Sequence, residues 1–228
     1  MVLFVPGFMQ RGDAWRAVAE LLPERYPSTL LDHREHELEG RLAEIAARDA
    51  SVLVGYSLGG RLVLRAALRS PARYSGVVTV GATAGIEDRS ERAARAEADA
   101  KLATWMEGAS IEDIVAVWER QPLFADQSEP LIEAQRAGRL SHSPSDLASL
   151  VRTAGQGALE PVWDDLAGLD IPLLAMAGDH DERYADAARR LAAAVPRGRF
   201  ELVEDAGHAP QLQRPEVVAG LITEFLGR

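Results

Sequence analysis

The segment that decides the fold is Ser51-Val52-Leu53-Val54-Gly55-Tyr56-Ser57-Leu58-Gly59-Gly60-Arg61. Its first four residues are an apolar run typical of a buried strand, and helical spacing begins after the paired glycines. Between them, Gly55-Tyr56-Ser57-Leu58-Gly59 matches the pattern G-x-S-x-G. A serine at this position lies on a sharp strand-to-helix turn, which only small flanking residues permit. The pattern therefore predicts that the Ser57 hydroxyl stands clear of a sheet as a reactive group.

Short apolar runs of the same kind recur along the chain and alternate with longer stretches of helical periodicity. Each run is bounded by Gly, Pro or Asp, and a continuous apolar run is typical of a strand covered on both faces. Strand–helix–strand alternation predicts an α/β fold with a mostly parallel sheet flanked by helices. The expected strands are Val2–Val5, Thr29–Leu31, Ser51–Val54, Val77–Val80, Pro172–Ala177 and Phe200–Val203.

One segment, from about Gly85 to Asp165, contains helical patterns and no clear strand. Asp88 with Glu91 resembles a capping pair at a helix start, and so does Ser110 with Asp113. We therefore expect a core formed by residues 1–84 and 166–228, and an all-helical lid inserted over residues 85–165.

Composition and charge exclude several classes of protein. The 228 residues carry 25 Lys and Arg against 35 Asp and Glu, a formal net charge of −10, which disfavours nucleic acid or an anionic membrane as a partner. There is no Cys, so a thiolate nucleophile, a disulfide framework and a zinc–thiolate site are excluded. No stretch approaches the roughly 20 apolar residues that span a bilayer. We expect a cytoplasmic monomer or small homo-oligomer.

A reactive serine needs a base, and the base needs a carboxylate that orients it. Asp181 and His208 each follow an expected strand, in the order Ser, Asp, His that is typical of an α/β-hydrolase. The carboxyl ends of parallel strands meet at one edge, so these residues can converge on Ser57. Asp179 competes with Asp181 as the acid, but its place beside Gly178 favours a role in the turn.

The other histidines are weaker candidates for the catalytic base. His33 and His36 lie in a charged stretch and are expected to be solvated, whereas His142 and His180 are expected to be non-catalytic.

An oxyanion hole needs two backbone N–H groups aimed at developing negative charge. Those of Leu58, after the serine, and Phe8, after the first strand, are the candidates.

With these motifs in place, the whole chain resembles the α/β-hydrolase superfamily. The lid narrows the resemblance to the 2-succinyl-6-hydroxy-2,4-cyclohexadiene-1-carboxylate synthases of menaquinone biosynthesis. The segments that carry it are Gly55–Arg61, Ser90–Arg95, Val117–Phe124 and Gln135–Leu140. Two stretches depart from the family pattern: Pro6 stands where the family usually has His, and residues 32–37 replace a Gly-rich turn.

The resemblance implies a lyase that eliminates pyruvate from a cyclohexadiene carrying a succinyl group and an enolpyruvyl ether. It implies no cofactor and no metal, and a small substrate with three carboxylates. Ser57, His208 and Asp181 would form the catalytic triad. Carried over by motif position, Arg61, Arg95 and Arg139 would hold substrate carboxylates, and Tyr56, Trp118 and Phe124 would line the pocket.

Several alternatives remain open from the residues. The same triad suits a hydrolase of a small ester, a thioester or a carbon–carbon bond. A non-catalytic, ligand-binding member of the fold is a third hypothesis. For Arg95 and Arg139 the alternative is a solvated helix face paired with acidic side chains. For Trp118 and Phe124 it is the packed interior of the lid.

Overall fold

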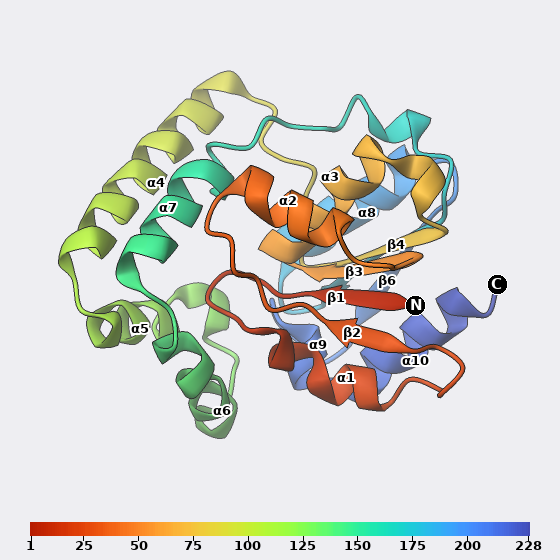
Figure 1. Ribbon diagram of the computed structural model, residues 1–228, viewed down its shortest axis with the longest axis horizontal. Helices are drawn as coiled ribbons and strands as arrows, with labels where there is room; N and C mark the ends of the chain where they lie inside the picture. Colours follow the sequence, from red (N-terminus) through yellow and green to blue (C-terminus); the bar gives the residue numbers. More distant parts are fainter.

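A six-stranded, all-parallel sheet forms the centre of the computed structural model, which describes residues 1–228, and its strand order is β2-β1-β3-β4-β5-β6 (Figure 1). Every expected strand is present, with ends displaced by at most two residues. The strands are β1 (Val2–Val5), β2 (Ser28–Leu30), β3 (Val52–Tyr56), β4 (Gly76–Val80), β5 (Leu173–Gly178) and β6 (Gly198–Val203).

Helices cover both faces of this sheet, which explains why its strands are continuously apolar. Because side chains alternate along a strand, Leu3 and Leu53 enter the core on one face, whereas Phe4 and Val54 enter the core on the other. The first face packs against α2 (Leu38–Ala46), α3 (Leu58–Arg69) and α8 (Glu182–Ala194); the second packs against α1 (Arg16–Glu20), α9 (Pro210–Gln213) and α10 (Pro215–Leu226) (Figure 1).

Between β4 and β5 the chain forms only helices, which lie beyond the carboxyl ends of the strands (Figure 1). These helices are α4 (Arg89–Gly108), α5 (Ile111–Glu119), α6 (Glu129–Leu140) and α7 (Pro144–Ala154). α4 packs against α7, and α5 against α6. Met106, Ile114 and Leu147 belong to an apolar cluster separate from the two sheet cores, which Met9 joins from the loop after β1. We refer to residues 85–165 as the helical insertion.

Local signals account for the starts of two of these helices. The Asp88 side chain accepts hydrogen bonds from the backbone N–H groups of Ser90 and Glu91, and Ser110 accepts one from Asp113. These are the caps that the sequence predicts. Short 3-10 helices complete the chain at Gly12–Trp15, Pro71–Arg73, Pro122–Phe124 and Leu166–Gly168. No helix is both long and apolar enough to cross a membrane.

The prediction that His33 is solvated is wrong. Its side chain is buried, and Nδ1 lies 2.6 Å from Oε2 of Glu44 on α2. Burial, reinforced by the nearby cation of Arg41, lowers the pKa of His33 to about 4. The charged residues around His33 in the sequence mislead, because α2 folds back over this stretch and supplies a partner from eleven residues downstream.

Candidate active site

Ser57 lies at the turn between β3 and α3, in strained backbone. Its φ is 49° and its ψ −108°, a region that side-chain-bearing residues rarely adopt. Two glycines make the turn possible: a Cβ on Gly55 would lie 2.3 Å from the carbonyl oxygen of Gly59, and one on Gly59 would lie 2.3 Å from that of Val5. The local sequence therefore dictates that the Ser57 hydroxyl stands at the turn after β3.

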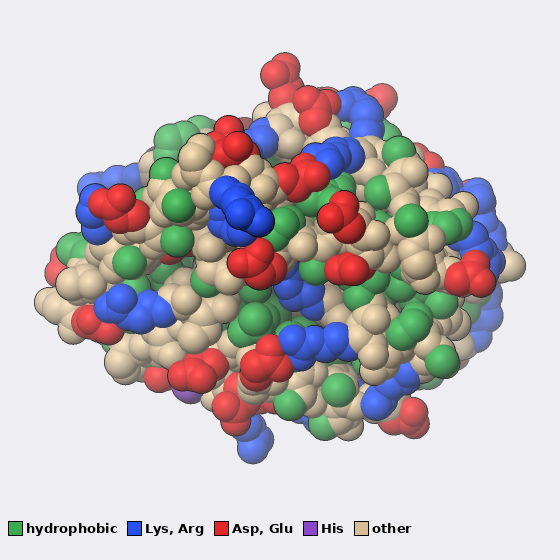
Figure 2. All heavy atoms as spheres, turned by 90° about the horizontal axis from the view of Figure 1, so that it is seen from above, with side chains coloured by type: hydrophobic (Ala, Val, Ile, Leu, Met, Phe, Trp, Pro, Cys, Tyr) green, Lys and Arg blue, Asp and Glu red, His purple; other side chains and the backbone are tan.

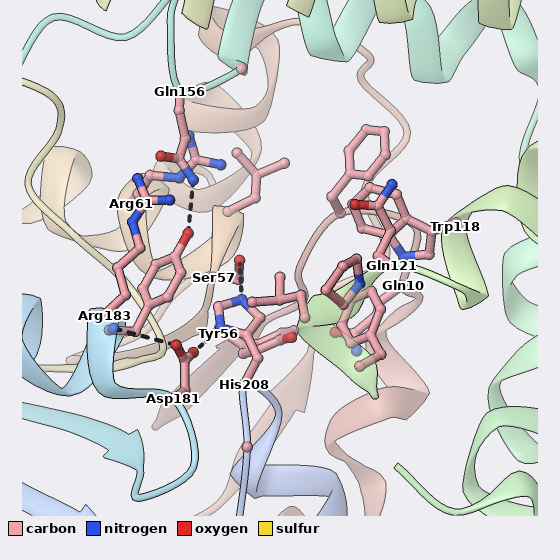
Figure 3. A pocket seen from close by; sticks show the side chains of 18 of the residues that line it. Gln10, Tyr56, Ser57, Arg61, Trp118, Gln121, Gln156, Asp181, Arg183 and His208 are labelled. Atoms are coloured by element: carbon pink, nitrogen blue, oxygen red, sulfur yellow. Dashed lines mark hydrogen bonds and ion pairs between the residues drawn. The ribbon is translucent and has the colours of Figure 1, made fainter. Parts of the chain in front are cut away.

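Hydrogen bonds connect Ser57 to a histidine and a carboxylate that follow other strands (Figure 3). His208, after β6, has Nε2 3.1 Å from Ser57 Oγ, and its Nδ1 lies 2.7 Å from Asp181 Oδ2. Asp181 also caps α8 by accepting from the N–H of Tyr184. Because the imidazole is only 2% exposed, water barely competes for these bonds. The arrangement can move a proton between the hydroxyl and the ring.

The rival acid, Asp179, has a different task. Its Oδ1 accepts a hydrogen bond of 3.1 Å from the N–H of Ala206 in the loop that carries His208. This bond ties the loop after β5 to the loop after β6. Asp179 therefore has the structural role that its place in the turn predicts.

A cavity of about 650 Å³ opens above Ser57, between the carboxyl edge of the sheet and the helical insertion. Every residue that the sequence predicts for the site lines it. These are Phe8, Tyr56, Ser57, Leu58, Arg61, Arg95, Trp118, Phe124, Arg139, Asp181 and His208.

Aromatic rings surround His208. The ring of Tyr184 lies 4.4 Å from the imidazole between centroids, that of Tyr56 lies 5.3 Å away and that of Phe124 6.4 Å. Burial raises the pKa of the Tyr56 hydroxyl well above its usual value, so it stays protonated. Trp118 joins Phe124 to Phe8 by ring contacts of 5.7 and 5.0 Å. These ring contacts pack the insertion onto the core.

The two candidate oxyanion donors are free. The backbone N–H groups of Phe8 and Leu58 donate to no acceptor within the chain, and both residues line the cavity. The neighbouring Gly7 N–H is occupied by Oε1 of Gln10 at 3.1 Å. Both candidate groups can therefore receive an anionic oxygen beside Ser57.

Arg61 is a buried cation without a carboxylate partner. It lies on the first turn of α3, and its one hydrogen bond to another part of the fold runs to the carbonyl oxygen of Ala154 at 3.3 Å. Burial lowers the pKa of Arg61 to about 10, which still leaves the side chain charged at neutral pH.

The other two predicted arginines reach the cavity already paired with acidic side chains. Arg95 Nε donates to Asp99 at 2.7 Å, one helical turn along α4. Arg139 donates to Glu119 at 3.0 Å and to Gln135 at 2.9 Å. Burial opposes ionisation of Glu119, but its hydrogen bonds from the arginines outweigh that cost and lower its pKa. The acidic partners are present but are not on a solvated face: Asp99 lines the cavity, and the Glu119 side chain is buried beside Arg139.

Sequence reasoning missed several polar residues of the cavity. Arg183 and Tyr184 stand in the first turn of α8, directly after Asp181, and Gln156 follows α7 and donates to the Tyr184 hydroxyl at 2.8 Å (Figure 3). Gln10 comes from the loop after β1. Only the position of Arg183 and Tyr184, within three residues of the candidate acid, offers a signal in the sequence.

Comparison with known proteins identifies the family of the chain. The model of the alpha/beta hydrolase family matches residues 2–221. A protein of Enterobacter sp. (strain 638) named 2-succinyl-6-hydroxy-2,4-cyclohexadiene-1-carboxylate synthase is 27% identical, over 99% of this chain and 91% of its own. A Bacillus subtilis (strain 168) protein, whose name assigns that activity provisionally, is 30% identical over 99% and 89%.

A solved structure has the same fold. The structure of MenH from S. aureus has a TM-score of 0.91 and 24% identity, and the match covers 99% of this chain and 92% of that one. The chain therefore belongs to the alpha/beta hydrolase family and, within it, to the family of the 2-succinyl-6-hydroxy-2,4-cyclohexadiene-1-carboxylate synthases.

Proposed function

We propose that this chain is a carbon–oxygen lyase that eliminates pyruvate from an enolpyruvyl-succinyl-cyclohexene carboxylate, giving 2-succinyl-6-hydroxy-2,4-cyclohexadiene-1-carboxylate. Because the elimination adds one ring double bond, a diene product requires a substrate ring with a single double bond, which corrects the cyclohexadiene that the resemblance implies. The observation that carries the proposal is the Ser57–His208–Asp181 chain, opening into the same cavity as the unpaired cation of Arg61. A buried cation without a counter-ion is costly, and a substrate carboxylate would supply one. The names of the relatives suggest which carboxylate compound it is.

In the proposed reaction Ser57 acts as a base and is not acylated. His208 Nε2 takes the hydroxyl proton while Asp181 stabilises the imidazolium, and Ser57 Oγ removes a proton from a ring carbon. The freed electron pair forms the new ring double bond, and the bond from the ring to the enolpyruvyl oxygen breaks. The departing enolate takes up a proton and becomes pyruvate. Protons and electrons balance within substrate and products, so the step requires no oxidant or reductant.

Groups around the proton transfer would lower its barrier. Negative charge that develops on the substrate during the elimination would be met by the N–H groups of Phe8 and Leu58. We propose that the helical insertion acts as the lid of the site, with Trp118 and Phe124 excluding water. In this proposal Arg61 binds one substrate carboxylate directly. Arg95 and Arg139 each bind a further substrate carboxylate while they keep the bond to their own acidic partner.

The test is pyruvate release from the enolpyruvyl precursor by the wild-type chain and by Ser57→Ala. We expect the variant to lose at least about 10³-fold in kcat, because a positioned base contributes about 10²–10⁴-fold and its partner His208 loses its task as well. Circular dichroism and thermal unfolding of the variant serve as folding controls. If both proteins release pyruvate equally slowly, the lyase proposal fails.

A hydrolase is the second candidate, and one observation favours it. Arg95 and Arg139 are already paired with Asp99 and Glu119, which leaves the site less cationic than a tricarboxylate substrate suggests. The same serine, histidine and free N–H groups would suit an acyl-enzyme intermediate. Fast turnover of p-nitrophenyl esters that is indifferent to Arg61→Ala would favour this candidate over the lyase.

A further inference from the structure

The first turn of α8 brings an arginine with no motif of its own to the cavity wall. Arg183 is the second residue of α8, two positions after Asp181, and it lines the cavity above Ser57. It also lines an adjoining cavity of about 520 Å³, which shares Gln156 and Tyr184 with the first. In Figure 3 its side chain extends from α8 in the direction of Gln156 and Arg61, on the side of the cavity that carries Asp181.

No carboxylate of the protein neutralises Arg183. Two acidic residues that line the adjoining cavity have other partners: Asp186 pairs with Arg189 at 2.7 Å, and Glu87 accepts from Arg190 at 2.8 Å. No acidic oxygen lies within 4 Å of the Arg183 guanidinium. Arg183 is therefore free although acidic side chains line the adjoining cavity.

The cavity's four arginines thus divide into two classes. Arg95 and Arg139 carry acidic partners, whereas Arg61 and Arg183 carry none. Of the free pair, Arg61 is buried against the core, and Arg183 is exposed at the cavity edge. An exposed guanidinium has not lost its hydration in the free protein, and its planar group of N–H donors remains available to a carboxylate.

We infer that Arg183 is a further substrate-binding residue, which takes a carboxylate of an anionic substrate at the edge of the cavity while Arg61 takes another deeper in. The inference rests on the proposed function, because it needs a substrate with more than one carboxylate. Local cations are needed because a net charge of −10 repels such a molecule at long range. In Figure 2, acidic and basic side chains are interspersed over the face shown, without one large basic patch. On that face no such patch would attract an anionic substrate from a distance.

The first measurement compares pyruvate release by the wild type, Arg183→Gln, Arg183→Lys and Arg197→Gln. Arg197 is the matched control, since it is exposed, lies just beyond the other end of α8 and makes no ion pair. We expect Arg183→Gln to raise KM about tenfold with kcat changed less than about threefold, and Arg183→Lys to fall between it and the wild type. A KM for Arg183→Gln equal to that of Arg197→Gln would overturn the inference and leave the lyase proposal standing.

A second measurement keeps the two proposals separable. Isothermal titration calorimetry at low salt would measure Kd for benzene-1,2,4-tricarboxylate and for benzoate. We expect Arg183→Gln to weaken the tricarboxylate about tenfold, to leave benzoate within about twofold, and to unfold at the wild-type temperature. If the wild type releases no pyruvate, this titration still decides: a selective loss supports Arg183 as a carboxylate anchor. An unchanged Kd, or no tricarboxylate binding by the wild type, overturns it.

Discussion

The two walls of the cavity hold their functional groups by different means. On the core side, backbone geometry at strand ends positions Ser57, Asp181 and His208, with contacts of 2.7 and 3.1 Å. On the side of the helical insertion, Arg95 and Arg139 are held by their own side-chain pairs with Asp99 and Glu119. The core therefore presents rigid groups suited to proton transfer, whereas the insertion presents charges that can exchange partners.

Two buried arginines, one in each wall of the cavity, differ in the same way. Arg61 of the core donates to the carbonyl oxygen of Ala154 and lacks an acidic partner, and Arg139 of the insertion is satisfied by Glu119 and Gln135. A substrate carboxylate gains more from a cation that has no counter-ion than from one that already has it. The difference implies that anion binding starts from the core wall and that the insertion adds to it.

The largest expected effect tests the core side of the cavity, where strand ends hold the catalytic groups. Asp181→Asn should lower kcat for pyruvate release by about 10³–10⁴-fold, because an amide can hold His208 in the wrong tautomer. The asparagine oxygen can still cap α8, so the fold should survive. Asp179→Asn is the matched control and should cost less than about tenfold. Equal losses in the two variants would break the distinction between the two carboxylates.

The next effect tests the side of the helical insertion, where the arginines have acidic partners. Glu119→Gln should lower the free energy of unfolding in urea by about 2 kcal/mol, because it leaves the Arg139 side chain, only 3% exposed, without its anion. The loss should stay below that of a fully buried pair, since Arg136 at the other end of Glu119 is exposed. Glu133→Gln removes only an exposed partner of Arg136 and should change stability by less than about 0.5 kcal/mol. A stable Glu119→Gln would contradict the idea that this pair holds the insertion.

A pH effect compares two histidines that each bury a ring nitrogen, one in each region. Burial lowers the pKa of His33, in the core, and of His142, in the insertion, to about 4. The unfolded chain binds these protons near pH 6.5 and the folded chain only near pH 4, so stability is full above about pH 6.5 and falls as pH drops toward 4. His33→Gln and His142→Gln should each flatten the pH dependence of the free energy of unfolding over that window. Unchanged slopes in both variants would show that the histidines do not titrate this way.

The smallest expected effect tests a local signal inside the insertion. Ser110→Ala removes the cap that accepts from the N–H of Asp113 and should lower the free energy of unfolding by about 1 kcal/mol. Ser128 occupies the corresponding place before α6 but makes no side-chain cap bond. Thermal unfolding of Ser128→Ala should therefore resemble the wild type, and an equal loss in both variants would argue against a specific capping bond.

Local patterns were enough to predict much of the core and the candidate site. Apolar runs predict the six strands because strands buried on both faces need apolar side chains throughout. The glycines around Ser57 predict the turn because any larger side chain there would collide with backbone. The insertion's caps were equally visible, since each depends on residues within three positions of one another. By contrast, the burial of His33 beside Glu44 depends on how α2 folds back, and its charged neighbours concealed it.

The sequence alone determined the α/β architecture, the serine at the strand-to-helix turn and the order of its partners, because these depend on short-range spacing and on strands that end at a common edge. Tertiary structure decided which cations are free. Arg139 meets Glu119 across twenty residues, and two acids near Arg183, Asp186 and Glu87, pair with Arg189 and Arg190. Pairing between long side chains depends on which helices pack together, and no residue spacing in the sequence records it.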